Sequence, residues 1–388
     1  MARRGGWQRR LVVAAALAVL LAIAAGAAWY FVVGSAQMRD LDARRALAEL
    51  SITVGQDEET GGTRIVLPPG ATQLTLETAL PELKKISNVN RLHLTDSEVS
   101  DLGPVAQLSD LQWLDVSGSA VTDLRPLSGL ANLQVLDLSA TAVGDLGPLQ
   151  STPKLRWLNL SLTKASDLRL LSSLQALRVL YLSGTPISDI APIAQIEGLE
   201  ELDLSDTGIS SLEHLADLKS LKVLVLANTP VADLTPLSSL SKLTALDISG
   251  SKVEDFSPVA RFTQLRVIDL GHTAIEDLTP IGQLPELRML LLTGTPVSDL
   301  TPLATLWSLE WLSLSETAVA DLTALAKLGS LITIDLSRTQ VLELAPLHRH
   351  SVLEVLDLSG VPVSPEAVAA LRESLTRTEG SEVRIVYP

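Results

Sequence analysis

Residues 111–132 read LQWLDVSGSAVTDLRPLSGLAN, and the arrangement of leucines in this stretch returns every 22 residues along the chain. The shared pattern is L-x-x-L-x-L-x-x-T-x-V-x-D-L-x-P-L-x-x-L-x-x. It begins at Val89 and keeps its register through thirteen units without an insertion. A fixed period of this length is typical of repeat architectures, in which each unit packs against its neighbours. The chain is therefore predicted to form one long array rather than several globular domains.

The first half of each unit predicts a short strand and a turn. The fourth and sixth positions, such as Leu136 and Leu138, alternate along the strand and are expected to point inward. The ninth position is Thr or Ser in twelve units, for example Thr141. A small hydroxyl at this position can bond the backbone where the strand turns. Stacked coils would then form a ladder of hydroxyl groups.

The second half of each unit predicts a short helical segment, most simply of 3-10 type. The thirteenth position is Asp in ten units, including Asp123, and it stands where a helix N-cap is expected. The sixteenth position is Pro in nine units, such as Pro126. Proline is tolerated in a first helical turn because its missing N–H would have no partner there. The seventeenth and twentieth positions return apolar residues to the core.

This pattern resembles the leucine-rich repeat family, in the 22-residue class of bacterial internalins and of the leucine-rich regulatory subunit of a Ser/Thr phosphatase. The stretch LDLSATAVGDLGPLQ at 136–150 shows the resemblance best, and the resemblance covers about 89–375. It implies an α/β solenoid: a horseshoe or arc with a parallel concave sheet and short 3-10 or helical segments on the convex side. Thr stands where the family's ladder usually has Asn. Such a resemblance fixes architecture and says little about the ligand.

The segments that flank the 89–363 array predict caps for its two ends. Residues 34–88 predict a juxtamembrane helix, two strands around a Gly-Gly turn, and a shortened first coil at 71–88 made of a strand and then a helix. Residues 364–388 predict a helix followed by a final strand. Ser364 is the expected N-cap of that helix and Pro365 its first residue.

The amino terminus carries a membrane signal. Leu11–Val33 is 23 residues without a charge, about 35 Å as a helix, which is enough to cross a hydrocarbon core of about 30 Å. Four arginines in residues 1–10 predict that this basic tail stays in the cytoplasm. A cleaved signal peptide is the alternative, because small residues at 25–28 offer a cleavage site. In both cases the repeat domain is expected to be periplasmic or extracellular, and the uncleaved segment makes a single-pass membrane protein.

Composition and motifs argue against several function classes. The net charge of −15 argues against nucleic acid as a partner. The absence of Cys excludes disulfides and Cys-ligated zinc. No Gly-rich phosphate loop occurs and no Ser-His-Asp set is suggested. The HRH stretch at 348–350 offers only two metal ligands and is interpreted as solvated surface. We therefore expect no enzymatic activity, no cofactor and no metal.

Candidate ligand-binding residues occupy the third and fifth positions, which flank an inward leucine and should face outward on the concave sheet. The third position is mostly apolar and holds three of the six tryptophans. Valine there suits any strand, but exposed aromatic rings mark contact sites. The fifth position holds columns of aspartate, which belong to the common LDLS strand and could attract a basic ligand or calcium. The candidates are Trp113, Asp115, Asp137, Trp157, Asn159, Tyr181, Asp203 and Trp311.

These features predict a membrane-tethered protein that binds a protein or peptide, or a glycan stacked on the rings, through its concave face. Contact is expected to centre on the amino-terminal half, around Trp113 and Trp157, where the rings would form an aromatic floor beside Asp115 and Asp137. A structural scaffold of the cell envelope is the main alternative. A phosphatase-type regulatory subunit is a further one, which the hydrophobic amino terminus disfavours.

Overall fold

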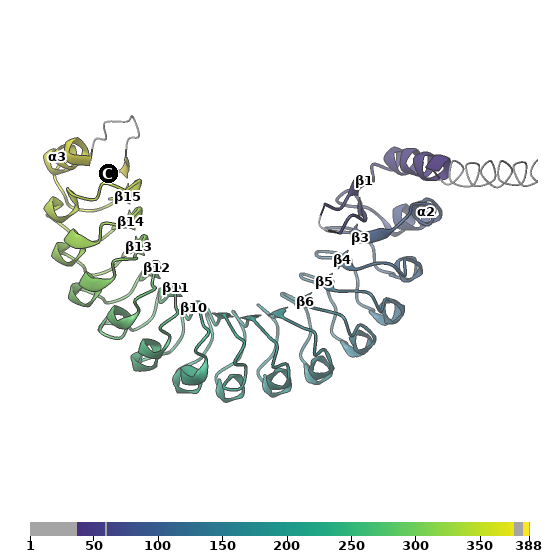
Figure 1. The fold of residues 1–388 in the computed structure, drawn as a ribbon, viewed down its shortest axis with the longest axis horizontal. Coiled ribbons are helices and arrows are strands. Elements are labelled where there is room, and N and C mark those ends of the chain that lie inside the picture. Colours follow the sequence, from purple (N-terminus) through teal and green to yellow (C-terminus); the bar gives the residue numbers. More distant parts are fainter. Residues whose placement is uncertain (1–36, 59, 376–382, 388) are drawn as a thin grey trace, which may run out of the picture.

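A computed structural model describes residues 37–58, 60–375 and 383–387. Within these residues the chain winds into a curved solenoid whose coils follow one another along an arc (Figure 1). The strands line the inner, concave side and the 3-10 helices the outer, convex side. The arc, the parallel sheet and the 3-10 segments confirm the architecture that the 22-residue pattern predicts.

The expected tail at 1–10 and membrane segment at 11–33 lie outside the described residues. In the part of the chain that the structure describes, no helix is long and apolar enough to cross a membrane.

One sheet runs through the described residues in chain order, from β1 to β16. β1 (Thr53–Gln56) pairs antiparallel with β2 (Thr63–Val66), and every later neighbour is parallel. From β3 to β15 each residue pairs with the one 22 positions further on, as Trp113 does with Val135. The parallel strands are β3 (Val89–His93), β4 (Trp113–Asp115), β5 (Val135–Asp137), β6 (Trp157–Asn159), β7 (Val179–Tyr181), β8 (Glu201–Asp203), β9 (Val223–Val225), β10 (Ala245–Asp247), β11 (Val267–Asp269), β12 (Met289–Leu291), β13 (Trp311–Ser313), β14 (Thr333–Asp335), β15 (Val355–Asp357) and β16 (Arg384–Val386).

The convex side carries a short 3-10 helix in each of the first twelve coils, and the repeated Asp precedes ten of these helices. Oδ1 of Asp123 accepts a 2.9 Å bond from the Arg125 N–H, while the N-cap residue itself is Leu124. The predicted carboxylate–amide bond is confirmed, but it closes an Asx turn one residue before the N-cap. The helices are η1 (Val105–Gln107), η2 (Arg125–Gly129), η3 (Gly147–Ser151), η4 (Arg169–Ser173), η5 (Ala191–Gln195), η6 (Glu213–Leu215), η7 (Thr235–Ser239), η8 (Ser257–Arg261), η9 (Ile281–Gln283), η10 (Thr301–Thr305), η11 (Thr323–Lys327) and η12 (Ala345–Leu347).

The ninth-position hydroxyls bond within their own coils. Oγ1 of Thr141 donates a 2.6 Å bond to the Leu138 carbonyl three residues earlier, and the same bond recurs in the other coils that carry Thr. The stacked hydroxyls therefore form a column of side chains, but no chain of hydrogen bonds runs from coil to coil. Where Ser takes this place, at Ser97, Ser119 and Ser251, the buried hydroxyl has no partner.

The eighth position of the unit is a backbone requirement that the sequence pattern does not reveal. In all thirteen described coils it adopts a left-handed conformation, with φ between 51° and 72°. Glycine fills it in five coils, including Gly118 and Gly184, and side-chain-bearing residues such as Ala140 and Leu162 fill it elsewhere. This conformation turns the chain sharply after the strand, which glycine does without steric cost. The side chains at this position share no chemistry, so the pattern shows it as variable.

Both ends of the array are covered. A helix over residues 37–49 buries Ala43 and Leu47, and the β1–β2 hairpin follows it. Residues 71–88 contain the helix α2 (Gln73–Leu83), capped by Thr72, but no strand within that range, in contrast to the prediction. At the other end, Ser364 Oγ accepts a bond from the Ala367 N–H at the start of α3 (Pro365–Leu375), which confirms the predicted cap of that helix.

His350 corrects the interpretation of 348–350 as solvated surface. It occupies the twentieth position, which is an inward one, and only 1% of the residue is exposed. Its Nδ1 lies 3.2 Å from the Leu347 carbonyl oxygen and its Nε2 lies 3.1 Å from the Leu325 carbonyl oxygen. A neutral imidazole has one N–H, so it can donate to only one of these two acceptors. Burial lowers the pKa of His350, and the two carbonyls oppose that shift.

We expect His350 to make the carboxyl-terminal coils sensitive to acid. Its pKa in the folded state lies below the value of about 6.5 that it has when unfolded, so the unfolded chain binds the proton first. The contribution of neutral His350 to the free energy of unfolding should therefore be fully present above pH 6.5, and it should be lost as the pH drops below that value. In thermal unfolding at pH 7.5, 6.5 and 5.5, the variant His350→Leu should lose less melting temperature than the natural chain. Parallel curves for the two proteins would contradict this assignment.

Candidate functional site on the concave sheet

The register aligns equivalent side chains into rows along the arc. In β4 the central Leu114 is fully buried, while Trp113 and Asp115 on either side are half-buried and face the concave surface. The same alternation recurs in most later strands. The third and fifth positions therefore face outward, and each forms a row with adjacent members about 4.8 Å apart.

The fifth-position aspartates hold the ends of the strands. Oδ1 of Asp137 accepts a 2.9 Å bond from the Ser139 N–H and a 2.6 Å bond from its hydroxyl. Asp115 and Asp203 make the same pair of bonds to the serines two residues on. One carboxylate oxygen of each is thus used in an Asx turn. In Asp137 the other oxygen accepts a bond from the Asn159 side chain at 3.3 Å.

Two aspartates in this row have opposite electrostatic surroundings. Burial raises the pKa of Asp115, but hydrogen bonds from His93, Ser117 and Thr95 outweigh it and lower the pKa to about 2. Burial also raises the pKa of Asp269, and the adjacent charge of Asp247 adds to this rise against a bond from a backbone amide. Asp115 is therefore a satisfied carboxylate, whereas the Asp269 carboxylate would be stabilised by an arriving cation.

Trp113 joins the array to its amino-terminal cap. The Arg91 guanidinium carbon lies 4.3 Å from the centroid of the Trp113 ring, and Nε of Arg91 lies 2.7 Å from Oδ2 of Asp57, which follows β1. The His93 ring also lies beside the indole, with 6.2 Å between centroids. The Trp113 Nε1 is buried without a hydrogen-bond partner among the described residues. The ring is therefore engaged by its own chain, a contact that the repeat pattern could not reveal.

Trp157 and Tyr181 form a second aromatic pair on neighbouring strands. Their rings meet edge to face, with 5.5 Å between centroids, and the Tyr181 hydroxyl donates a 3.0 Å bond to the Glu201 carboxylate. Burial, followed by this bond to Glu201, raises the pKa of Tyr181 to about 12. The phenol is therefore a fixed donor, and both residues are half-buried at outward positions of the sheet. Glu201 was not among the predicted site residues, although it occupies the third position of the next coil.

Trp311 stands apart from the other candidates. The first six form one continuous area on β4–β7, with Asp203 beside it on β8, whereas Trp311 lies on β13. Trp311 is 44% exposed, and Trp307 in the turn before that strand is 56% exposed. In the described part of the chain, neither ring has an aromatic or side-chain hydrogen-bond partner. The most accessible tryptophan on the concave sheet thus lies in the carboxyl-terminal half.

A row of bases at the second position borders the sheet and was not among the predicted site residues. Lys222 pairs with Glu200 of the previous coil, and Arg288 pairs with Glu310 of the next at 2.7 Å. Exposed pairs of this kind contribute little stability, so the row is chiefly a charged surface. Its exposed basic members are Arg156, Arg178, Lys222, Arg266 and Arg288.

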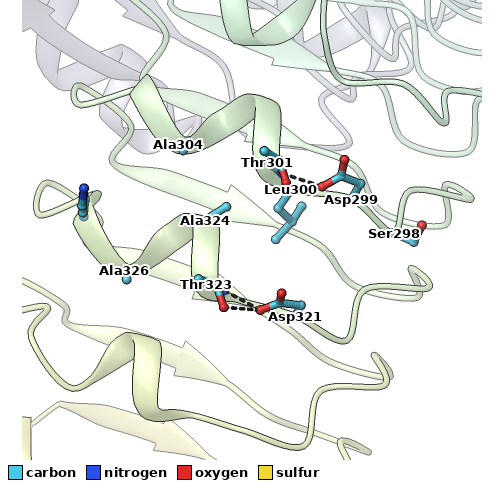
Figure 2. A pocket seen from close by; sticks show the side chains of 10 residues that line it. Ser298, Asp299, Leu300, Thr301, Ala304, Asp321, Thr323, Ala324 and Ala326 are labelled. Carbon is cyan, nitrogen blue, oxygen red and sulfur yellow. Dashed lines mark hydrogen bonds between the residues drawn. The ribbon is translucent and has the colours of Figure 1, made fainter.

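The convex side offers a groove but no distinctive chemistry. The groove has a volume of about 470 Å³ and lies between η10 and η11. Figure 2 shows side chains that line it, among them Asp299 and Asp321. Both carboxylates accept bonds from the threonine two residues on, Thr301 and Thr323. They repeat the Asx turn found throughout the array. Among the described residues no group of three or more His, Cys, Asp or Glu is placed to hold a metal ion.

Comparison with known proteins supports the architecture. A family model described as leucine-rich repeats (2 copies) matches residues 197–239. The chain is similar to an internalin, InlF, of Listeria monocytogenes, with 30% identity over 66% of this chain and 77% of that chain and a TM-score of 0.62. A leucine-rich repeat protein of Leptospira interrogans is 23% identical over 76% of this chain and 84% of that chain, with a TM-score of 0.68.

A more distant similarity is to a plant receptor. The leucine-rich repeat ectodomain of the receptor kinase GASSHO1/SCHENGEN3 from Arabidopsis thaliana was solved in complex with CASPARIAN STRIP INTEGRITY FACTOR 2. It is 20% identical over 79% of this chain and 42% of that chain, with a TM-score of 0.58, which shows a shared fold. No curated protein matches this chain.

We expect Trp113→Ala to lower the free energy of unfolding by about 2 kcal/mol, because it removes a half-buried ring that packs against Arg91. Trp311→Ala is the matched control and should change stability by less than about 0.5 kcal/mol, because its ring is exposed. Chemical denaturation of both variants measures the difference. Equal effects would show that the ring of Trp113 does not join the array to its cap.

Proposed function

Because the chain belongs to the internalin-like class of leucine-rich repeat proteins, we propose that it is a non-enzymatic recognition protein whose concave face binds a protein or peptide. The observation that carries this proposal is Trp311, a large ring 44% exposed on the concave sheet with no partner for its ring among the described residues. Exposed tryptophans are strongly enriched among residues that dominate binding energy. A ring left open in this way is expected to find its partner in another molecule.

The aspartates of the concave rows fit binding better than catalysis. Each of Asp115, Asp137 and Asp203 already uses one carboxylate oxygen to hold its strand end. A general acid or base needs a carboxyl group free to exchange a proton near the working pH, and the low pKa of Asp115 is far from that range. These groups instead present fixed negative charge beside the aromatic rings. Protein and peptide partners with apolar and basic groups suit such a surface.

We further propose that the protein is held at a membrane by Leu11–Val33, with its repeat domain periplasmic or extracellular. This part rests on the sequence alone: the uncharged run and the arginines that precede it. Recovery of the protein from the soluble fraction, trimmed near residue 28, would contradict the anchor and leave concave-face recognition untouched.

Recognition can be tested with the full-length protein in lipid nanodiscs, used to capture partners from the envelope and secreted proteins of the source cells. For a partner so identified, we expect Trp311→Ala, or Trp113→Ala with Trp157→Ala, to weaken affinity at least tenfold, as hot-spot truncations do. Leu342→Ala is the control, because Leu342 is 62% exposed but lies off the sheet. The proposal fails if the control weakens binding as much as the concave variants, or if all variants bind like the natural chain.

A further inference from the structure

The longest apolar run on the concave face begins at β9. The third position there is apolar in five consecutive strands, which pair in register. Earlier in the array a shorter apolar run, from Trp113 to Val179, lies between Arg91 and Glu201, so the longest run is the one in the carboxyl-terminal half. We call it the apolar row, and its members are Val223, Ala245, Val267, Met289 and Trp311. The first four are half-buried and Trp311 is exposed, so each has surface available on the concave side.

Charged side chains lie on both sides of the apolar row. On one side, the second position holds the exposed bases Lys222, Arg266 and Arg288, together with Thr244 and Glu310. On the other side, the fifth position holds the carboxylates Asp247 and Asp269 on β10 and β11, whereas Val225, Leu291 and Ser313 are uncharged. The two charged positions are three residues apart along each strand, which corresponds to about 10 Å. An apolar strip about 10 Å wide thus has mostly basic side chains along one edge and two adjacent carboxylates at the centre of the other.

Part of this charge is unsatisfied within the chain. Asp247 and Asp269 each use Oδ1 to accept a bond from a backbone amide two residues on, at 2.9 Å and 2.8 Å. Their other carboxylate oxygens have no hydrogen-bond or ion-pair partner among the described residues. On the opposite edge, Arg266 forms no ion pair within the described chain, although its neighbours Lys222 and Arg288 do. Both edges therefore keep groups that a complementary partner would pair.

We propose that the apolar row on β9–β13 seats an amphipathic helix of the partner protein, with acidic side chains over the bases and basic side chains over Asp247 and Asp269. Five strands about 4.8 Å apart span about 19 Å, the length of about 13 helical residues. The strip of about 10 Å matches the diameter of a helix with its side chains, about 10–12 Å. A single extended strand is narrower and would leave one charged edge unpaired. This inference rests on the proposed concave-face function and names the kind of element recognised.

The test uses a synthetic 14-residue helical peptide with leucines on one face, glutamates along one flank and lysines along the other. Its control is a peptide of the same residues in scrambled order, which has no apolar face. Binding to the full-length protein in nanodiscs is measured by fluorescence anisotropy. We expect the amphipathic peptide to bind at least tenfold more tightly than the scrambled one.

Protein variants locate the binding site. Val267→Asp places a charge in the apolar row and should weaken peptide binding at least tenfold. Val135→Asp makes the same change at the same half-buried position of β5 and should leave affinity within twofold. Arg266→Glu alters an exposed side chain without risk to folding. It should weaken binding severalfold and strengthen binding of a peptide that carries lysine on both flanks.

Three outcomes would overturn the helix proposal: equal binding of the scrambled peptide, indifference to both Val267→Asp and Arg266→Glu, or sensitivity to Val135→Asp instead. Failure of the helix proposal can be told apart from failure of the proposed function. If a natural partner still depends on Trp311 or Trp113 while the peptide does not bind, concave-face recognition stands and only the helical partner is wrong.

Discussion

The buried residue at the fourth position of each coil is the contact on which the rest of the structure depends. From Leu92 to Leu356 it is Leu or Ile and at most 1% exposed, and each pairs in register with its equivalent in the next coil. Because these residues stack in register from coil to coil, the equivalent residues at every other position of the unit are aligned as well. The unbroken spacing of 22 residues therefore turns a linear sequence into rows on a surface. Composition along a row, rather than along the chain, decides what that surface can bind.

Much of the fold could be predicted because the repeat makes local and global structure agree. The inward leucines, the outward third and fifth positions, the 3-10 segments and the Ser364 cap all follow from periodicity and capping chemistry. The burial of His350 was also available from the sequence, because the twentieth position is an inward one in the pattern. For His350, position in the repeat determines burial more strongly than the polarity of the side chain does.

Contacts outside the repeat could not be predicted in the same way. The link from Asp57 through Arg91 to Trp113 depends on how the β1–β2 hairpin docks on the first coil, and no periodicity constrains that docking. This link makes the ring of Trp113 part of the contact between the array and its cap. In the amino-terminal half the rings are held by their own chain, whereas in the carboxyl-terminal half Trp311 and the apolar row remain open. The fifth-position aspartates have the same role in both halves of the array. One carboxylate oxygen fixes the end of the strand, and the other faces the concave side.

Site-specific photocrosslinking tests the central claim, that partners contact the concave rows, most directly. A benzophenone amino acid would replace Val267 on the concave sheet in one variant and the exposed Thr305 on the convex side in another, in cells that naturally make this protein. Irradiation followed by mass spectrometry identifies any captured partner. The structure predicts a defined adduct from position 267 and none from position 305. Adducts that form only from the convex position would contradict it.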